Sequence, residues 1–109
     1  MLGQKEIECL NACNECAAAC LQCASACLKE NDPKPLTSCI ALDMECADIC
    51  GLAAASIARG DKHMKAICSL CADACQACGA ECAKHAIDHC KRCAETCKRC
   101  VEVCRAMAH

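Results

Sequence analysis

The sequence predicts an all-α protein, an antiparallel up-down-up-down bundle of four helices with a cysteine-lined core. The 19 cysteines recur in steps of three and four residues, which is the spacing of one helical face, whereas a strand would need a period of two. Turn signals separate the columns of cysteine, and short connections make neighbouring helices antiparallel. We expect one domain, residues 1–109, with helices at about residues 3–30, 36–59, 62–84 and 87–107.

Turn signals of different strength separate the four expected helices. Residues 31–35 contain two prolines, which end the first helix and begin the second. Gly60 is typical of the residue after a helix, and Asp61 is expected to cap the third helix. The last break contains neither glycine nor proline. There the step from Cys82 to Cys90 is eight residues, which leaves the shared face of a continuous helix and therefore indicates a turn.

Each expected helix carries a column of cysteines at the a and d positions of a heptad, which is the inward face of a bundle. Alanine flanks the first column, and polar residues lie on its outer side. All 19 cysteines are candidate metal ligands: Cys9, Cys13, Cys16, Cys20, Cys23, Cys27, Cys39, Cys46, Cys50, Cys68, Cys71, Cys75, Cys78, Cys82, Cys90, Cys93, Cys97, Cys100 and Cys104.

The composition excludes several classes of protein. The chain has no aromatic residue and a formal net charge of −2, and it contains no basic run, so neither nucleic acid nor an anionic membrane is an expected partner. No apolar run approaches the roughly 20 residues of a membrane span. The start of the chain lacks the apolar segment of a signal peptide. These features predict a cytosolic protein, in which thiols are kept reduced.

Three interpretations of so many cysteines can be compared. Cysteine packs as a small apolar residue, but alanine, leucine and valine fill such positions without redox chemistry. Disulfides are disfavoured by a reducing compartment, and residues at i and i+4 have Cβ atoms about 5–6 Å apart, whereas a disulfide needs about 3.8 Å. Metal binding fits better, because soft thiolates select Cu(I), Zn(II) or iron–sulfur clusters.

Charge favours Cu(I) among these metals. A buried row of thiolates has to be neutralised. A zinc ion on four thiolates leaves a charge of −2, so several such sites in one core would repel each other. One Cu(I) per thiolate is neutral, which predicts on the order of 15–20 Cu(I) per chain. The alternatives are a general zinc or cadmium buffer and a redox or iron–sulfur protein. No catalytic constellation is evident, so we do not expect an enzyme.

The two ends of the expected bundle differ. The end that holds both termini and the turn near residue 60, here called the apolar end, has Leu2, Ala53, Ile57, Met64 and Met107 on inward positions. The opposite end, here called the polar end, has Glu30, Asp43 and His85 on inward positions and His89 beside Cys90. We expect Asp43, His85 and His89 to receive copper there. The alternative is that His85 and Asp88 cap a helix turn and that His89 is solvated.

The cysteine columns, together with the segments from Leu42 to Cys50 and from His85 to Cys90, resemble the bacterial copper storage proteins. This resemblance covers nearly the whole chain, and the absence of a signal peptide places it with the cytosolic branch. The resemblance implies a four-helix bundle that holds Cu(I) mainly on cysteines and assembles as a homotetramer. It also implies copper access at one end of the bundle, where the cytosolic members have His and Asp.

Overall fold

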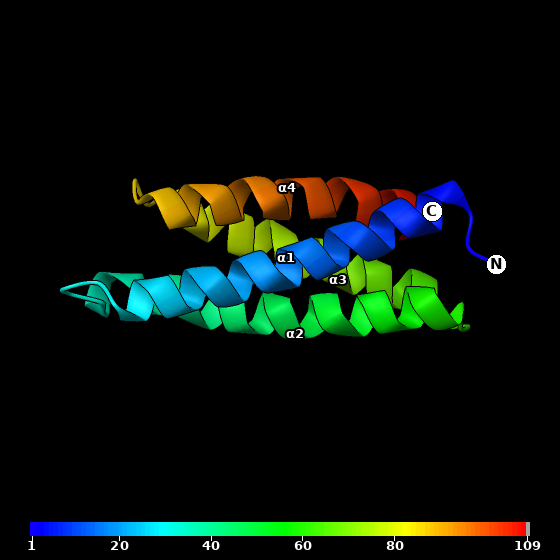
Figure 1. Cartoon of the computed structure of the whole chain (residues 1–109), viewed down its shortest axis with the longest axis horizontal. Coiled ribbons are helices and arrows are strands. Elements are labelled where there is room, and N and C mark those ends of the chain that lie inside the picture. The colour runs from blue at the N-terminus through cyan, green and yellow to red at the C-terminus, as the bar shows by residue number, and fades with distance from the viewer. Residues whose placement is uncertain (109) are drawn as a thin grey trace.

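The computed structural model describes residues 1–108, so His109 of the expected domain lies outside the described residues. The fold is an antiparallel four-helix bundle, as expected, and the described residues contain no strand (Figure 1). Each helix packs against the two neighbours that the up-down-up-down order requires. The helices are α1 (Gln4–Leu28), α2 (Thr37–Arg59), α3 (Met64–Cys82) and α4 (Asp88–Ala108), with a short 3-10 turn, η1 (Lys34–Leu36), before α2.

The bundle is long and narrow, with extents of 47 × 17 × 17 Å. Both termini and the α2–α3 turn lie at one end, and the α1–α2 and α3–α4 turns lie at the other (Figure 1). The alternation of three- and four-residue steps places the cysteines of every helix on its inward face. Cysteine, rather than leucine or valine, therefore fills most of the shared core.

The turn at the apolar end shows one difference from expectation. Gly60 has φ +64°, the left-handed conformation that favours glycine after a helix, and its N–H bonds back to Ser56 and Ile57. The N-cap of α3 is His63 rather than Asp61. Asp61 instead ties the turn together, because its Oδ1 accepts hydrogen bonds from the Ser56 hydroxyl at 2.7 Å and from the His63 N–H at 3.0 Å.

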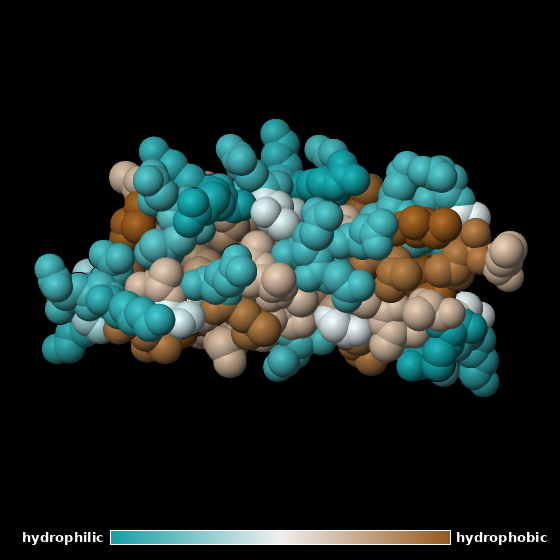
Figure 2. Space-filling model, viewed as in Figure 1, coloured by the Kyte–Doolittle hydropathy of each residue, from teal (hydrophilic) through white to brown (hydrophobic). Residues whose placement is uncertain are grey.

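Apolar side chains close the bundle beyond the last cysteines at the apolar end. Ala53, Ile57 and Met107 are buried, whereas Leu2 and Met64 are only half-buried and line a surface hollow of about 450 Å³ with Ile57. In Figure 2, brown apolar atoms gather at this end, whereas hydrophilic side chains cover much of the opposite end beside a smaller group of apolar atoms. None of the four helices, over the residues described, has the combination of length and apolar character that a membrane crossing requires.

Candidate metal centre

The interior of the bundle is a continuous column of thiols. Every cysteine is buried, with at most 1% of its surface exposed, and all of them are free thiols. Successive layers draw sulfur atoms from different helices, so that groups of four lie within 4.8 Å of one another. Four groups that share no residue follow the axis from the apolar to the polar end: Cys13, Cys71, Cys100 and Cys104; Cys16, Cys46, Cys50 and Cys75; Cys20, Cys78, Cys93 and Cys97; Cys23, Cys27, Cys39 and Cys90.

Sulfur contacts connect the first three layers, and the carboxyl group of Asp43 contacts thiols of both the third layer and the fourth. Cys9 extends the first group, with its sulfur 3.7 Å from that of Cys104. Cys16 lies 3.8 Å from Cys75 and 3.7 Å from Cys97, and so connects the second group to the third. Cys16, Cys20 and Cys75 each have several sulfur neighbours within 4.0 Å, which is the arrangement that allows one thiolate to bridge two metal ions.

Sulfur atoms one helical turn apart are close to the spacing of a two-coordinate site. The Sγ–Sγ distance is 4.0 Å for Cys16 and Cys20 and 3.8 Å for Cys46 and Cys50. These values lie at or just below the lower limit of the roughly 4–5 Å that a linear sulfur–copper–sulfur unit spans. A small side-chain rotation is therefore enough to admit an ion.

Burial disfavours the thiolate form of two cysteines near the polar end. Desolvation raises the pKa of Cys27 to about 11, because the thiolate form loses its hydration. Desolvation also raises the pKa of Cys39. Metal binding must displace these protons, so that each bound ion exchanges a thiol proton for a positive charge.

Asp43 lies inside the column, with its carboxyl group among thiols near the polar end. Its side chain is 0% exposed, because it occupies the α2 position one turn inside Cys39. The thiols of Cys78 and Cys93 donate hydrogen bonds to Oδ1 at 3.1 and 3.3 Å. Desolvation raises the pKa of Asp43 to about 6. This carboxyl group therefore accepts thiol hydrogen bonds next to the layer nearest the polar end.

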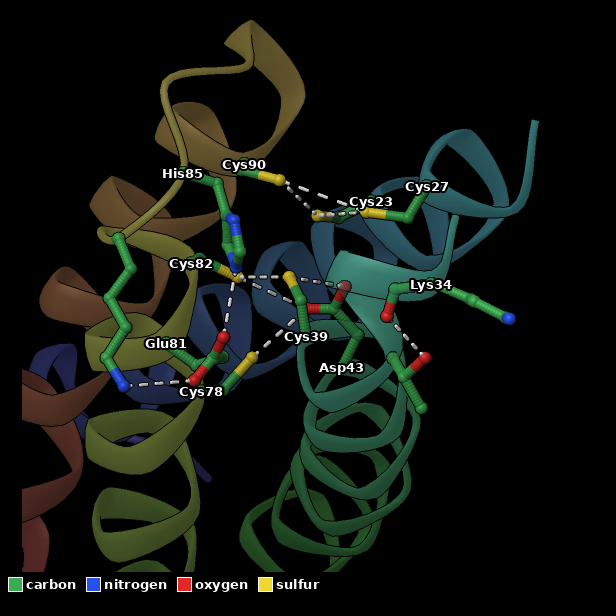
Figure 3. Close-up of polar contacts among 12 residues, drawn as sticks. Cys23, Cys27, Lys34, Cys39, Asp43, Cys78, Glu81, Cys82, His85 and Cys90 are labelled. Atoms are coloured by element: carbon green, nitrogen blue, oxygen red, sulfur yellow. Dashed lines mark hydrogen bonds and ion pairs between the residues drawn. The ribbon is translucent and has the colours of Figure 1, made fainter. Parts of the chain in front are cut away.

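His89 lies at the polar end in contact with three thiols. Its Nδ1 is 3.6 Å from Cys23, 3.8 Å from Cys27 and 3.6 Å from Cys90. The three sulfur atoms point toward one another in Figure 3. The other ring nitrogen, Nε2, is buried without a hydrogen-bond partner and lies 3.5 Å from a carboxylate oxygen of Glu30. His89 is thus the imidazole that the fold brings to the thiols.

His85 is half-buried in the α3–α4 turn and pairs with an acid (Figure 3). Its Nε2 lies 3.0 Å from Oε2 of Glu81, and this pairing lowers the pKa of Glu81. Glu81 was not among the residues expected at this end from the sequence. Its spacing of four residues before His85 is the signal that could have found it, because residues at i and i+4 are neighbours on a helix. Glu30, expected on an inward position, is 42% exposed at its side chain.

The comparisons with known proteins agree with this geometry. A model of the copper storage protein family matches residues 3–109. The Cu(I)-bound copper storage protein BsCsp3 of Bacillus subtilis is 49% identical, with a TM-score of 0.93 over 97% of this chain and 100% of its own. A cytosolic copper storage protein from Streptomyces lividans, loaded with five coppers, is 40% identical, with a TM-score of 0.93 over 96% of this chain and 92% of its own.

A curated relative, the cysteine-rich protein YhjQ of Bacillus subtilis (strain 168), is 51% identical over 69 residues. That match covers 63% of this chain and spans 57% of the relative's length. The family match, in contrast, extends over nearly all of this sequence, and the four-helix bundle and the buried thiols of this structure agree with it. The chain belongs to the copper storage protein family.

Proposed function

We propose that this chain is a cytosolic store that holds many Cu(I) ions on the thiolates of its interior, on the order of one ion per cysteine. The observation that carries the proposal is the continuous column of buried thiols in groups of four. The family match and the copper-loaded structures of two similar proteins support it. The cytosolic location is supported by the similarity to the cytosolic Streptomyces protein.

Cu(I) is the ion that a fully buried thiolate column favours. Binding releases one thiol proton for each Cu(I), so the net charge of the core is unchanged at one ion per thiolate. A tetrahedral zinc ion on four thiolates leaves a charge of −2, and the four successive groups would accumulate that charge inside a narrow bundle. We propose storage rather than catalysis, with all 19 cysteines as ligands.

Uptake is proposed to occur at the polar end through His85 and His89. His89 is in contact with three thiols of the outermost group, and His85 lies half-buried in the neighbouring turn. Asp43 is proposed to act one layer deeper, where its carboxylate accepts hydrogen bonds from thiols before they bind copper. We also propose a homotetramer, for which the exposed leucines Leu21, Leu28 and Leu52 offer apolar contact surface.

An anaerobic titration of the reduced, metal-free protein with Cu(I) against a competing chelator tests the proposed function. We expect uptake of more than about ten Cu(I) per chain, approaching one per thiol. The double variant C13S/C100S should bind about two ions fewer, because both sulfur atoms belong to one buried layer. Met44→Leu is the control, since it removes an exposed sulfur and should leave the load unchanged. Saturation at one or two ions would contradict copper storage.

A further inference from the structure

We propose that Cys23, Cys27, His89 and Cys90 form a separate tetrahedral site for one divalent ion of the zinc class at the polar end. Zinc binds nitrogen and sulfur ligands, and three cysteines with one histidine are a closed set of four for a tetrahedral ion. These ligands are shared with the proposed copper store, but the binding of zinc to them does not depend on copper storage. Only its effect on copper uptake, described below, rests on the proposed function.

The four ligand atoms already form a nearly regular tetrahedron. The three Sγ–Sγ distances are 4.0 Å for Cys23 and Cys27, 3.9 Å for Cys23 and Cys90, and 3.9 Å for Cys27 and Cys90. The three distances from Nδ1 of His89 to the same sulfur atoms are 3.6, 3.8 and 3.6 Å. All six edges therefore lie between 3.6 and 4.0 Å.

These edges match those that a zinc ion imposes. Bonds of about 2.3 Å to sulfur and about 2.0–2.1 Å to nitrogen give tetrahedral edges of about 3.8 Å between sulfurs and about 3.6 Å between nitrogen and sulfur. The structure exceeds these edges by only a few tenths of an ångström. An ion could therefore bind with little rearrangement of α1 or of the start of α4.

Charge separates this site from the deeper layers. Binding converts three thiols to thiolates and releases three protons to water, so that zinc with a neutral imidazole leaves a charge of −1. The all-sulfur groups deeper in the column, such as that of Cys16, Cys46, Cys50 and Cys75, would carry −2 with zinc and no contact with solvent. Zinc binding at the polar end thus leaves less uncompensated charge, and less of it buried, than zinc binding in the deeper layers.

Glu30 supplies the supporting contact that a metal-bound histidine normally has. Nε2 of His89 has no hydrogen-bond partner, yet it lies 3.5 Å from Oε2 of Glu30. A shift of a few tenths of an ångström lets Nε2–H donate to this carboxylate. That hydrogen bond holds the tautomer in which Nδ1 carries the free lone pair toward the three sulfur atoms. Glu30 is therefore a positioning residue for His89.

An ion in this site would occupy the ligands that copper reaches first. Zinc bound there would occupy three thiols of the group nearest the polar end until Cu(I) displaces it. Preloading with one equivalent of Zn(II) should therefore slow the uptake of Cu(I). Equal uptake rates with and without zinc would overturn this part of the proposal.

The test is a titration of the reduced, metal-free protein with Zn(II) alone against a competing chelator, with nitrogen-15 NMR of the histidine rings. The first equivalent should bind tightly and shift Nδ1 of His89. His89→Ala should weaken this first binding at least tenfold and Glu30→Ala by roughly tenfold. His63→Ala, at the other end of the bundle, is the control and should bind as the unmodified protein does. Circular dichroism of each metal-free variant checks that the bundle is folded.

Two results would contradict the proposed zinc site. One is a first zinc equivalent that leaves the His89 ring unshifted, which would indicate an all-sulfur site. The other is unchanged affinity in a folded His89→Ala variant. A parallel Cu(I) titration separates this outcome from failure of the proposed function. If the protein binds many Cu(I) ions but no zinc on His89, only the zinc site is refuted. If zinc binds to His89 but the protein takes up only one or two Cu(I) ions, only copper storage is refuted.

Discussion

The two ends of the bundle are built on the same helices and differ in what their side chains can do. At the apolar end, Ala53, Ile57 and Met107 are buried beyond the last thiols and offer no ligand except a methionine sulfur. At the polar end, His89 contacts three thiols and has a carboxylate beside its second ring nitrogen. We therefore expect the shared core to store the ions and the residues at each end to determine where ions enter.

Of the changes considered for the two ends, opening the apolar end is expected to alter the free energy of unfolding most. Ile57 is 0% exposed, and Ile57→Ala removes a buried side chain that the surroundings cannot replace. The free energy of unfolding of the metal-free protein should fall by about 3–4 kcal/mol, measured by denaturant titration under reducing conditions. Cu(I) capacity should not change, because no thiol is lost. Leu52→Ala, at a side chain 47% exposed, is the control and should cost less than about 0.5 kcal/mol.

The second expected effect is on the pH dependence of stability, through the buried carboxyl group of Asp43. The pKa of Asp43 is raised from 3.8 to about 6, so the folded protein holds a proton that the unfolded chain has released between these pH values. Stability therefore falls as the pH rises through this window. Asp43→Asn cannot ionise, and its metal-free form should be more stable by about 2–3 kcal/mol at pH 7.

This difference should disappear below about pH 4, where Asp43 is protonated in both states. Denaturant titrations at several pH values measure it. Asp48→Asn, at an exposed position of the same helix, is the control and should show no such pH dependence. A stabilisation by Asp43→Asn that is equal at pH 4 and pH 7 would contradict this explanation.

The smallest effect is expected in the turn at the apolar end. Gly60 has a φ of +64°, so Gly60→Ala forces a side chain into the left-handed conformation and should cost about 1 kcal/mol. Gly51→Ala is a matched change in the interior of α2, where a new methyl group meets nothing within 4 Å. It should stabilise the protein by about 0.5–1 kcal/mol. Thermal unfolding of the two variants should therefore shift in opposite directions.

The fold was predictable because its signal is local. Steps of three and four residues define a helical face, and the columns of cysteine repeat this signal in each helix. The burial of all the thiols follows from the same pattern. The turn before α4 was placed only by the step from Cys82 to Cys90, and the structure has it at residues 83–87.

Contacts between helices were not predictable from spacing. The burial of Asp43 depends on the thiols of α3 and α4 that its carboxyl group meets. The approach of Glu30 to His89 likewise joins the segment after α1 to the start of α4. Heptad positions identify a side chain as inward or outward. They do not state which side chain of another helix it meets, so the tetrahedron around His89 became evident only in three dimensions.

Uptake at the polar end is tested most directly by stopped-flow measurement of the rate of Cu(I) binding in variants of the two ends. The double variant H85A/H89A changes the polar end, and His63→Ala changes an exposed histidine at the apolar end. We predict that the double variant takes up Cu(I) roughly tenfold more slowly, with its final load unchanged, whereas His63→Ala matches the unmodified protein. Uptake that is equally fast in all three proteins, or slowed only by His63→Ala, would contradict uptake at the polar end.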